Sequence, residues 1–199
     1  MYPFQFLFAL ALLSPEAVVE QARKDGAKDV RVNRIQLDED PQLEVVIQFI
    51  IPAQGVIGRV LDQDGGQWRE VGKFGSWWRF EDADAEKFLE FRETVVSGIK
   101  EIVVRYRGGG TEVSGTTLEV HRLRKGVLVN VLSVKEQETA MEHPSGDVFE
   151  TSAQVTFALG RIDTVTTRNP GNKKTCVTYT WNDSRFRFEE SSAQNDCRP

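Results

Sequence analysis

Three carboxylates with the alternate spacing of a cation-binding loop, Asp38, Asp40 and Glu44, lie within a stretch of seven residues. Hard cations such as Ca²⁺ are bound by several carboxylate and carbonyl oxygens, so this spacing makes calcium the one cofactor that the sequence suggests. The alternative is an acidic turn in contact with solvent, because three carboxylates alone make a poor cage. The sequence favours the turn, and it predicts that neither calcium nor any other cofactor is needed to hold the fold together.

Nucleophilic catalysis has little support in the sequence. His121 and His143 are the only histidines and lie in different segments. Alternation with Leu118 and Val120 predicts that His121 faces solvent, and neither histidine has a serine or cysteine context for a nucleophile. We therefore expect a protein that is not an enzyme. A hydrolase that works through two carboxylates remains an open alternative, because any two acids can meet in space.

Two further segments have side chains suited to binding. The run Arg107–Thr111 (RGGGT) combines exposed amides with an arginine, which suits an anion, but no helix follows it as a phosphate loop requires. We therefore interpret it as a flexible loop. Trp77 and Trp78 could stack on a sugar, but neighbouring residues on a strand point to opposite faces, so at most one is exposed. Trp68 and Trp181 are expected in the core.

The two cysteines, Cys176 and Cys197, lie close to the carboxyl end. An even count in an exported chain favours a disulfide, whereas two free thiols would be expected in a cytosolic protein. The bond would fasten the polar tail Ser191–Pro199 to the last strands. Closing the loop between the two cysteines would stabilise the folded state by about 3 kcal/mol.

The first residues carry a signal of export. Phe4–Leu13 form an apolar run too short to span a bilayer but of the length of a signal-peptide core. We interpret residues 1–17 as a signal peptide cut after Ser14 or Ala17; a buried helix is the alternative. The protein is then secreted or periplasmic, with no stable membrane span. Its net charge of −5 disfavours nucleic acid as a partner.

The hydrophobic pattern changes from helical to alternating after Gly26. Ser14-Pro15 predicts the start of a helix, and Asp82 or Asp84 a second one with Phe88, Leu89 and Arg92 along one side. Lys135–Asp147 and the segment around Asn169 are expected to be loops. The predicted strands are 30–35, 43–51, 56–61, 67–74, 101–107, 118–123, 127–134, 149–157 and 162–167, followed by the hairpin 177–188.

The predicted strands fall into a repeated pattern along the chain. An acidic residue opens an apolar run at Glu44 and again at Glu101, and a hairpin follows each run. We expect a single β-repeat domain over residues 18–199, with repeats near 30–75, 98–134 and 149–190. The alternative is an ordinary meander whose hairpins are alike by chance.

The segment LDEDPQLEVVIQF resembles the FG-GAP or VCBS repeats of integrin-like β-propellers. The pattern of that family is D-x-[DN]-x-D-G-x-x-D running into an apolar strand. Asp38, Asp40 and Glu44 match its third, fifth and ninth positions, whereas Gln36 and Pro41 replace the first Asp and the turn Gly. The resemblance implies a calcium loop and a propeller-like fold. Three repeats are too few to close a ring, which implies a partial or irregular propeller.

Together these features predict a mainly β fold of repeated antiparallel hairpins, propeller-like in part, with one or two short helices. The expected function is an exported non-catalytic binding or structural module whose partner is an unknown protein or extracellular ligand. A small apolar-ligand carrier built on a closed β-barrel is the alternative. A barrel predicts even alternation in every strand, and the apolar runs Leu43–Ile51 and Val127–Leu132 fit a packed sheet better.

Overall fold

The computed structural model of the protein describes residues 13–52, 55–76, 88–109, 113–142, 147–195 and 197. Within these ranges the chain forms a short helix followed by strands, which confirms the mainly β class. The elements in chain order are α1 (Pro15–Lys24), β1 (Lys28–Ile35), β2 (Glu44–Ile51), β3 (Gly55–Asp64), β4 (Gln67–Ser76), β5 (Leu89–Arg92), β6 (Glu101–Gly109), β7 (Val113–Arg124), β8 (Val127–Glu142), β9 (Asp147–Ala158), β10 (Arg161–Asn169), β11 (Lys173–Asn182) and β12 (Arg187–Asn195).

The strands form two open sheets in which every neighbouring pair is antiparallel. β1–β4 make a sheet of four strands in chain order, and β5–β12 make a second sheet of eight, again in chain order. We call β1–β4 the first unit, β5–β8 the second and β9–β12 the third. Among the described strands neither sheet closes on itself.

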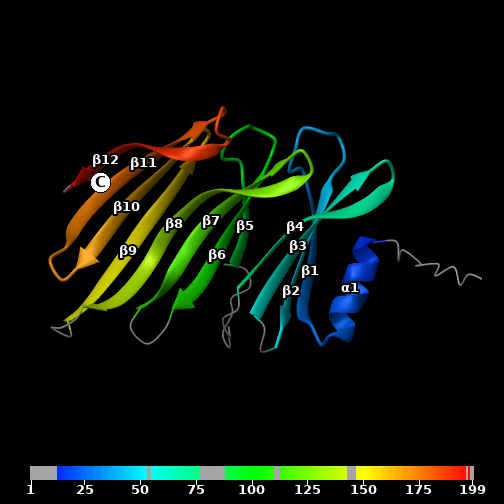
Figure 1. Cartoon of the computed structure of the whole chain (residues 1–199), viewed down its shortest axis with the longest axis horizontal. Coiled ribbons are helices and arrows are strands. Elements are labelled where there is room, and N and C mark those ends of the chain that lie inside the picture. Colours follow the sequence, from blue (N-terminus) through cyan, green and yellow to red (C-terminus); the bar gives the residue numbers. More distant parts are fainter. Residues whose placement is uncertain are drawn as a thin grey trace, which may run out of the picture.

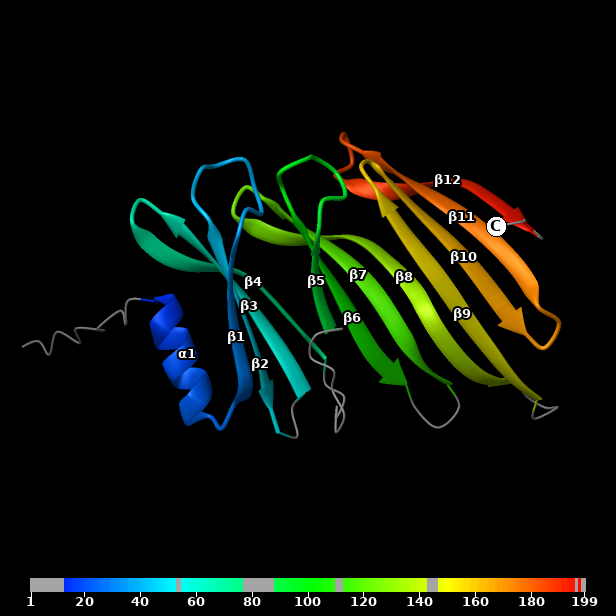
Figure 2. The same ribbon diagram turned by 180° about the vertical axis from the view of Figure 1, so that it is seen from behind.

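The units follow one another along the long axis of the molecule, with α1 at one end (Figures 1 and 2). Ser14 caps α1 as predicted, because its side chain accepts a hydrogen bond from the amide of Ala17 at 3.1 Å. Val18 and Ala22 of the helix are buried against the first unit, where they join Val45 and Ile47 of β2.

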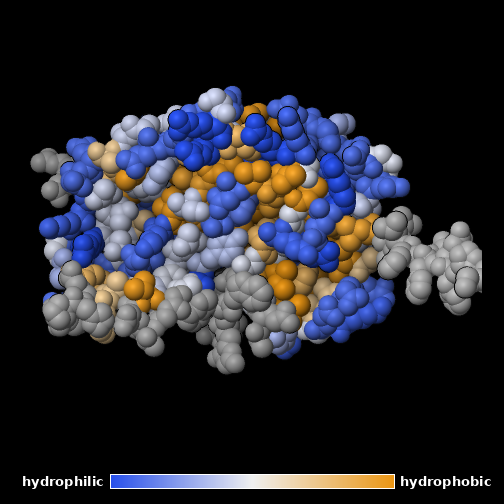
Figure 3. Space-filling view, in the orientation of Figure 1, coloured by the Kyte–Doolittle hydropathy of each residue, from blue (hydrophilic) through white to orange (hydrophobic). Residues whose placement is uncertain are grey.

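The two strands that contain the apolar runs, β2 and β6, are buried on both faces, as their continuous hydrophobicity predicts. In β2, Val45 faces the helix, whereas Val46 faces the core between the first and second units. In β6, Ile102 contributes to that same core, whereas Val103 faces a further core shared with the third unit. Figure 3 shows apolar residues gathered over the first two units and a more polar surface over the third.

The predicted disulfide joins Cys176 to Cys197. The polar tail is held by more than this bond, because Arg187–Asn195 form β12 and pair along β11. The disulfide was expected to order the tail, and the pairing of β12 with β11 is a second hold that was not predicted.

Three local predictions are also wrong. Lys135–Glu142 continue β8 instead of forming a loop, because β7 and β9 pair with them on either side. Leu89–Arg92 form a strand against β6 and not part of a helix. Gly108 and Gly109 belong to β6 and pair with β7, so they are not a free loop. Asp82, Asp84, Trp77, Trp78 and His143 lie outside the described residues.

Candidate cation site

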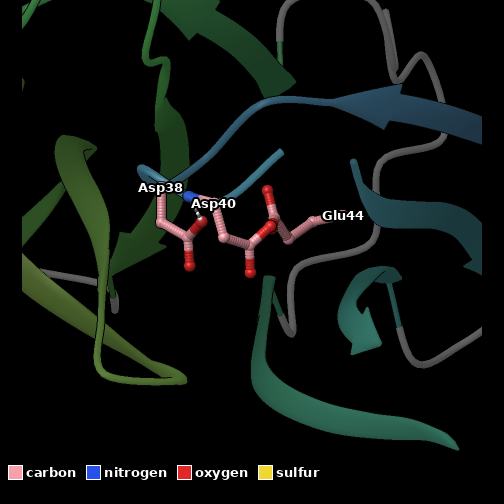
Figure 4. A group of neighbouring side chains, drawn as sticks. All are labelled: Asp38, Asp40 and Glu44. Carbon is pink, nitrogen blue, oxygen red and sulfur yellow. Dashed lines mark hydrogen bonds between the residues drawn. The ribbon is translucent and has the colours of Figure 1, made fainter. Parts of the chain in front are cut away.

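The loop 36–43 between β1 and β2 brings the three predicted carboxylates together. Asp38, Asp40 and Glu44 each offer a carboxylate oxygen, and these oxygens lie within 4.8 Å of one another. Figure 4 shows Asp40 between the other two side chains, with the carboxylate of Glu44 directed towards it. The cluster therefore joins two loop residues to the first residue of a buried strand.

Backbone amides hold one oxygen of each carboxylate in place. The amide of Asp40 donates to Oδ1 of Asp38 at 2.9 Å, and the amide of Gln42 donates to Oδ1 of Asp40 at 2.7 Å. The amide of Leu37 donates to Oε2 of Glu44 at 2.6 Å. These bonds orient the three side chains and leave the second oxygen of each for a further partner.

Gln36 fastens the loop from its beginning. Its side-chain Nε2 donates to the carbonyl oxygen of Asp38 at 2.8 Å and also to the carbonyl oxygen of Asp40. The amide nitrogen has no lone pair for a metal, so this side chain shapes the loop and its nitrogen is not a ligand. Gln36 occupies the position of the first aspartate in the FG-GAP pattern.

Glu44 is the unusual member of the cluster. The residue has no exposed surface, and its Oε1 is the one buried side-chain oxygen or nitrogen in the described part of the chain without a hydrogen-bond partner. Burial raises the pKa of this carboxyl to about 7, and the negative charges of Asp38 and Asp62 add to the effect. A solvated turn describes the exposed Asp40 but not this buried group, which needs a proton or a cation.

A fourth carboxylate, Asp62 on β3, lies beside the cluster. The neighbouring Leu61 pairs with Val45 across the sheet, which brings Asp62 next to the start of β2. Asp62 is buried and accepts hydrogen bonds from Nη2 and Nε of Arg69 at 2.8 and 3.2 Å. Asp62 could not be predicted as part of the site, because its nearness to Glu44 depends on strand register.

The same glutamate geometry recurs at the start of β6. Oε2 of Glu101 accepts the amide of Thr94 at 2.7 Å, and the two residues are seven positions apart, as are Leu37 and Glu44. Glu101 is fully buried, and burial raises its pKa against the opposing effect of Thr94 and Arg122. Oε1 of Glu101 accepts a hydrogen bond from Nη1 of the buried Arg122.

Arg122 holds the position in the second unit that Asp62 holds in the first. His121 precedes it and pairs with Ile102, as Leu61 pairs with Val45. A register shift occurs at the same place in both units, between Val60 and Leu61 and between Val120 and His121. The second unit thus supplies an internal cation where the first presents another carboxylate.

His121 is buried, so the prediction that it faces solvent is wrong. Its Nε2 lies 2.9 Å from Oε2 of Glu119, and its ring lies 6.4 Å from that of Phe74. Burial lowers the pKa of His121, and Glu119 opposes this effect. His121 lies on the face of β7 opposite Leu118 and Val120, and that face is buried as well because it packs against Phe74 of the first unit, which alternation along the strand alone could not show.

The chain matches no family model, and comparisons with curated proteins and with solved structures also find no match. The resemblance to FG-GAP or VCBS repeats therefore rests on the loop motif and stays a prediction. Among the described residues, no helix is long and apolar enough to cross a membrane.

Proposed function

We propose that the protein is an exported, non-catalytic binding module that takes up one Ca²⁺ in the loop 36–43, through Asp38, Asp40 and Glu44. The observation that carries the proposal is the buried Oε1 of Glu44, which has no partner among the described residues and belongs to a carboxylate beside two others. A divalent cation would neutralise this cluster and provide the missing partner.

The chemistry of the cluster favours calcium over other common metals. All three side chains supply carboxylate oxygens, which suit Ca²⁺, and water can complete its six to eight ligands. Zinc prefers histidine and cysteine ligands. Both cysteines are in the disulfide, and the imidazole of His121 is engaged by Glu119.

Export is supported by the disulfide, which persists in oxidising compartments. The partner that the module binds is an extracellular protein or ligand, and the polar strand β12 is an open edge of the second sheet on which such a partner can add. The first strand of the other sheet, β1, is open as well.

The alternatives find less support. A carrier for an apolar ligand needs an enclosed apolar cavity, whereas the described sheets are open. A groove of about 550 Å³ runs between β8 and β12, but charged and polar residues line much of it, among them Asn130, Ser133, Arg185 and Arg187. A carboxylate-based hydrolase has no specific observation in its favour.

Isothermal titration calorimetry with Ca²⁺ tests the proposal. We expect one ion per chain for the wild type and at least a tenfold loss of affinity in Glu44→Gln. Glu39→Gln is the matched control, because Glu39 is an exposed acid of the same loop outside the cluster. No binding by the wild type, or equal losses in the two variants, would contradict the proposal.

A further inference from the structure

The acidic loop of the first unit is bonded to the second unit. The carbonyl oxygen of Gln36 accepts the amide of Lys100 at 2.9 Å, and Lys100 immediately precedes β6. The side chain of Leu37 is buried in the core that both units share, together with Ile102 and Leu123. The two residues that begin the acidic loop therefore belong to the contact between the two sheets.

Arg69 makes a second connection between the acidic cluster and the second unit. Its guanidinium binds Asp62 and also lies against Gly126 in the turn between β7 and β8. A Cβ atom at Gly126 would come within 2.3 Å of Nη2 of Arg69, so any side chain at this position would have to displace the guanidinium. Asp62 thus connects the carboxylates of the first unit to a turn of the second.

The second and third units are joined in a corresponding way. The carbonyl oxygen of Thr94, in the loop before Glu101, accepts the amide of Gly160 at 2.7 Å. The guanidinium of Arg122 lies 5.6 Å from the ring centre of Trp181 and 5.9 Å from that of Phe186, while it also binds Glu101. Arg122 neutralises the buried glutamate and reaches the last hairpin at once.

We propose that Ca²⁺ in the loop 36–43 clamps the first unit onto the second, as Arg122 clamps the second onto the third. This inference rests on the proposed function and adds a regulatory role to the same site. Without the ion, the clustered carboxylates repel one another, and the loop that holds Gln36 and Leu37 against the second unit is loosened. With the ion, the loop becomes rigid and its bond to Lys100 is protected.

Hydrogen exchange measures this clamp residue by residue. We expect saturating Ca²⁺ to increase the protection of the Lys100 amide at least tenfold over a chelated sample. The amide of Gly160 is the internal control, because its bond to Thr94 joins the second and third units, away from the loop 36–43, and its protection should stay the same. If calorimetry shows that Ca²⁺ binds but Lys100 exchanges equally with and without it, the clamp is refuted and the proposed function stands. If Ca²⁺ does not bind, both fail.

A double variant makes the clamp permanent. Asp62→Arg with Arg69→Val copies into the first unit the pair Arg122 and Val129, which face each other across the hairpin of the second. Lys100 should then be protected at least tenfold over the chelated wild type, and Ca²⁺ should add nothing. Continued dependence on Ca²⁺ in this variant would refute the inference.

Asp64→Asn is the control for the double variant, because it removes an exposed carboxylate 3.8 Å from Arg69 and leaves Asp62 in place. This control should keep the response of Lys100 to Ca²⁺. If the double variant does not fold, Glu44→Gln serves instead, and Lys100 in that variant should not respond to Ca²⁺. A response of the wild-type size in Glu44→Gln would refute the clamp.

Discussion

The loops that precede Glu44 and Glu101 share a backbone arrangement and differ in the charge that meets the buried glutamate. Each glutamate accepts an amide from the residue seven positions before it. Glu101 also meets the guanidinium of Arg122, whereas Glu44 has Asp38, Asp40 and Asp62 as its neighbours. The same local fold can therefore have its buried charge compensated within the protein in one unit and depend on a proton or a cation from solution in another.

The difference follows from the cost of burying charge. An ionised carboxylate inside a protein is tolerated when it is paired and hydrogen-bonded, and otherwise it takes up a proton. Glu101 has Arg122 as a permanent partner, so its loop needs nothing from solution. Glu44 has an unpartnered oxygen, so the state of its loop depends on pH and on available cations.

The largest effect is expected when the second unit loses its internal cation. Arg122→Met leaves Glu101 buried without its partner and should lower the free energy of unfolding by about 3–5 kcal/mol in urea titrations. Arg124→Met is the control, because Arg124 is exposed and lies over the ring of Phe186 without an ion pair to Glu101. Equal losses of stability in the two variants would show that the ion pair between Arg122 and Glu101 does not stabilise the fold more than the exposed Arg124 does.

The third unit differs from the other two in its first connection and in its covalent bond. A short turn at Leu159-Gly160 stands where the other units have the long loop before Glu44 or Glu101, and the disulfide links Cys176 of β11 to Cys197. Replacing Cys176 and Cys197 with serine should lower the free energy of unfolding by about 3 kcal/mol, as expected for the 21-residue separation. Hydrogen exchange should show the loosening in β11 and β12 and leave the amide of Lys100 unchanged. A change confined to the first unit would contradict this division of the molecule.

Next in size is the pH dependence of the first unit. When a chelator removes Ca²⁺, the pKa of Glu44 rises from 4.5 to about 7 on folding. The stability that the folded state gains from this shift is therefore fully present below pH 4.5 and is lost as the pH rises through 7. The shift corresponds to at most about 3 kcal/mol. We expect Glu44→Gln to match the wild type at pH 4 and to be about 2 kcal/mol more stable at pH 8.

Denaturant titrations across this pH range provide the check on Glu44, and Glu39→Gln is again the control. Its stability profile should follow that of the wild type, because Glu39 is exposed. Parallel profiles for Glu44→Gln and the wild type would mean that Glu44 titrates normally in the folded protein.

The smallest effect is the thermal response to calcium. At a free Ca²⁺ concentration ten times the Kd, binding adds about 1.4 kcal/mol, which raises the Tm by about 3 °C for a chain of this size. The sequence alone predicts melts that overlap with and without chelator, so scanning calorimetry separates the two expectations. Arg122→Met should show the same calcium shift as the wild type, because the ion acts on the first unit.

Much of the fold was predictable because its signals are local. The apolar runs of β2 and β6, the Ser14 cap and the last hairpin follow from neighbouring residues alone, and the disulfide follows from the even count of cysteines. The predictions failed where tertiary pairing decides. Lys135–Glu142 is polar enough for a loop and becomes a strand between two neighbours, and Leu89–Arg92 has helical spacing but pairs with β6.

The candidate site was predictable to the same extent. Asp38, Asp40 and Glu44 are close in sequence, so their spacing identified them as possible calcium ligands, although it favoured a solvated turn over the cluster that the structure shows. Asp62 and Arg122 distinguish the two units, yet each reaches its glutamate across a strand pair whose register no local pattern specifies. The burial of Glu44, which decides between a solvated turn and a cation site, likewise depends on the packing of the two sheets.

A crystal structure with a calcium-mimicking lanthanide gives the most direct test of this account, because anomalous scattering locates the ion. We expect one anomalous peak about 2.3–2.6 Å from carboxylate oxygens of Asp38, Asp40 and Glu44, and none beside Glu101, where Arg122 supplies the charge. A peak at Glu101, or a fully soaked crystal with no peak in the loop 36–43, would contradict the account.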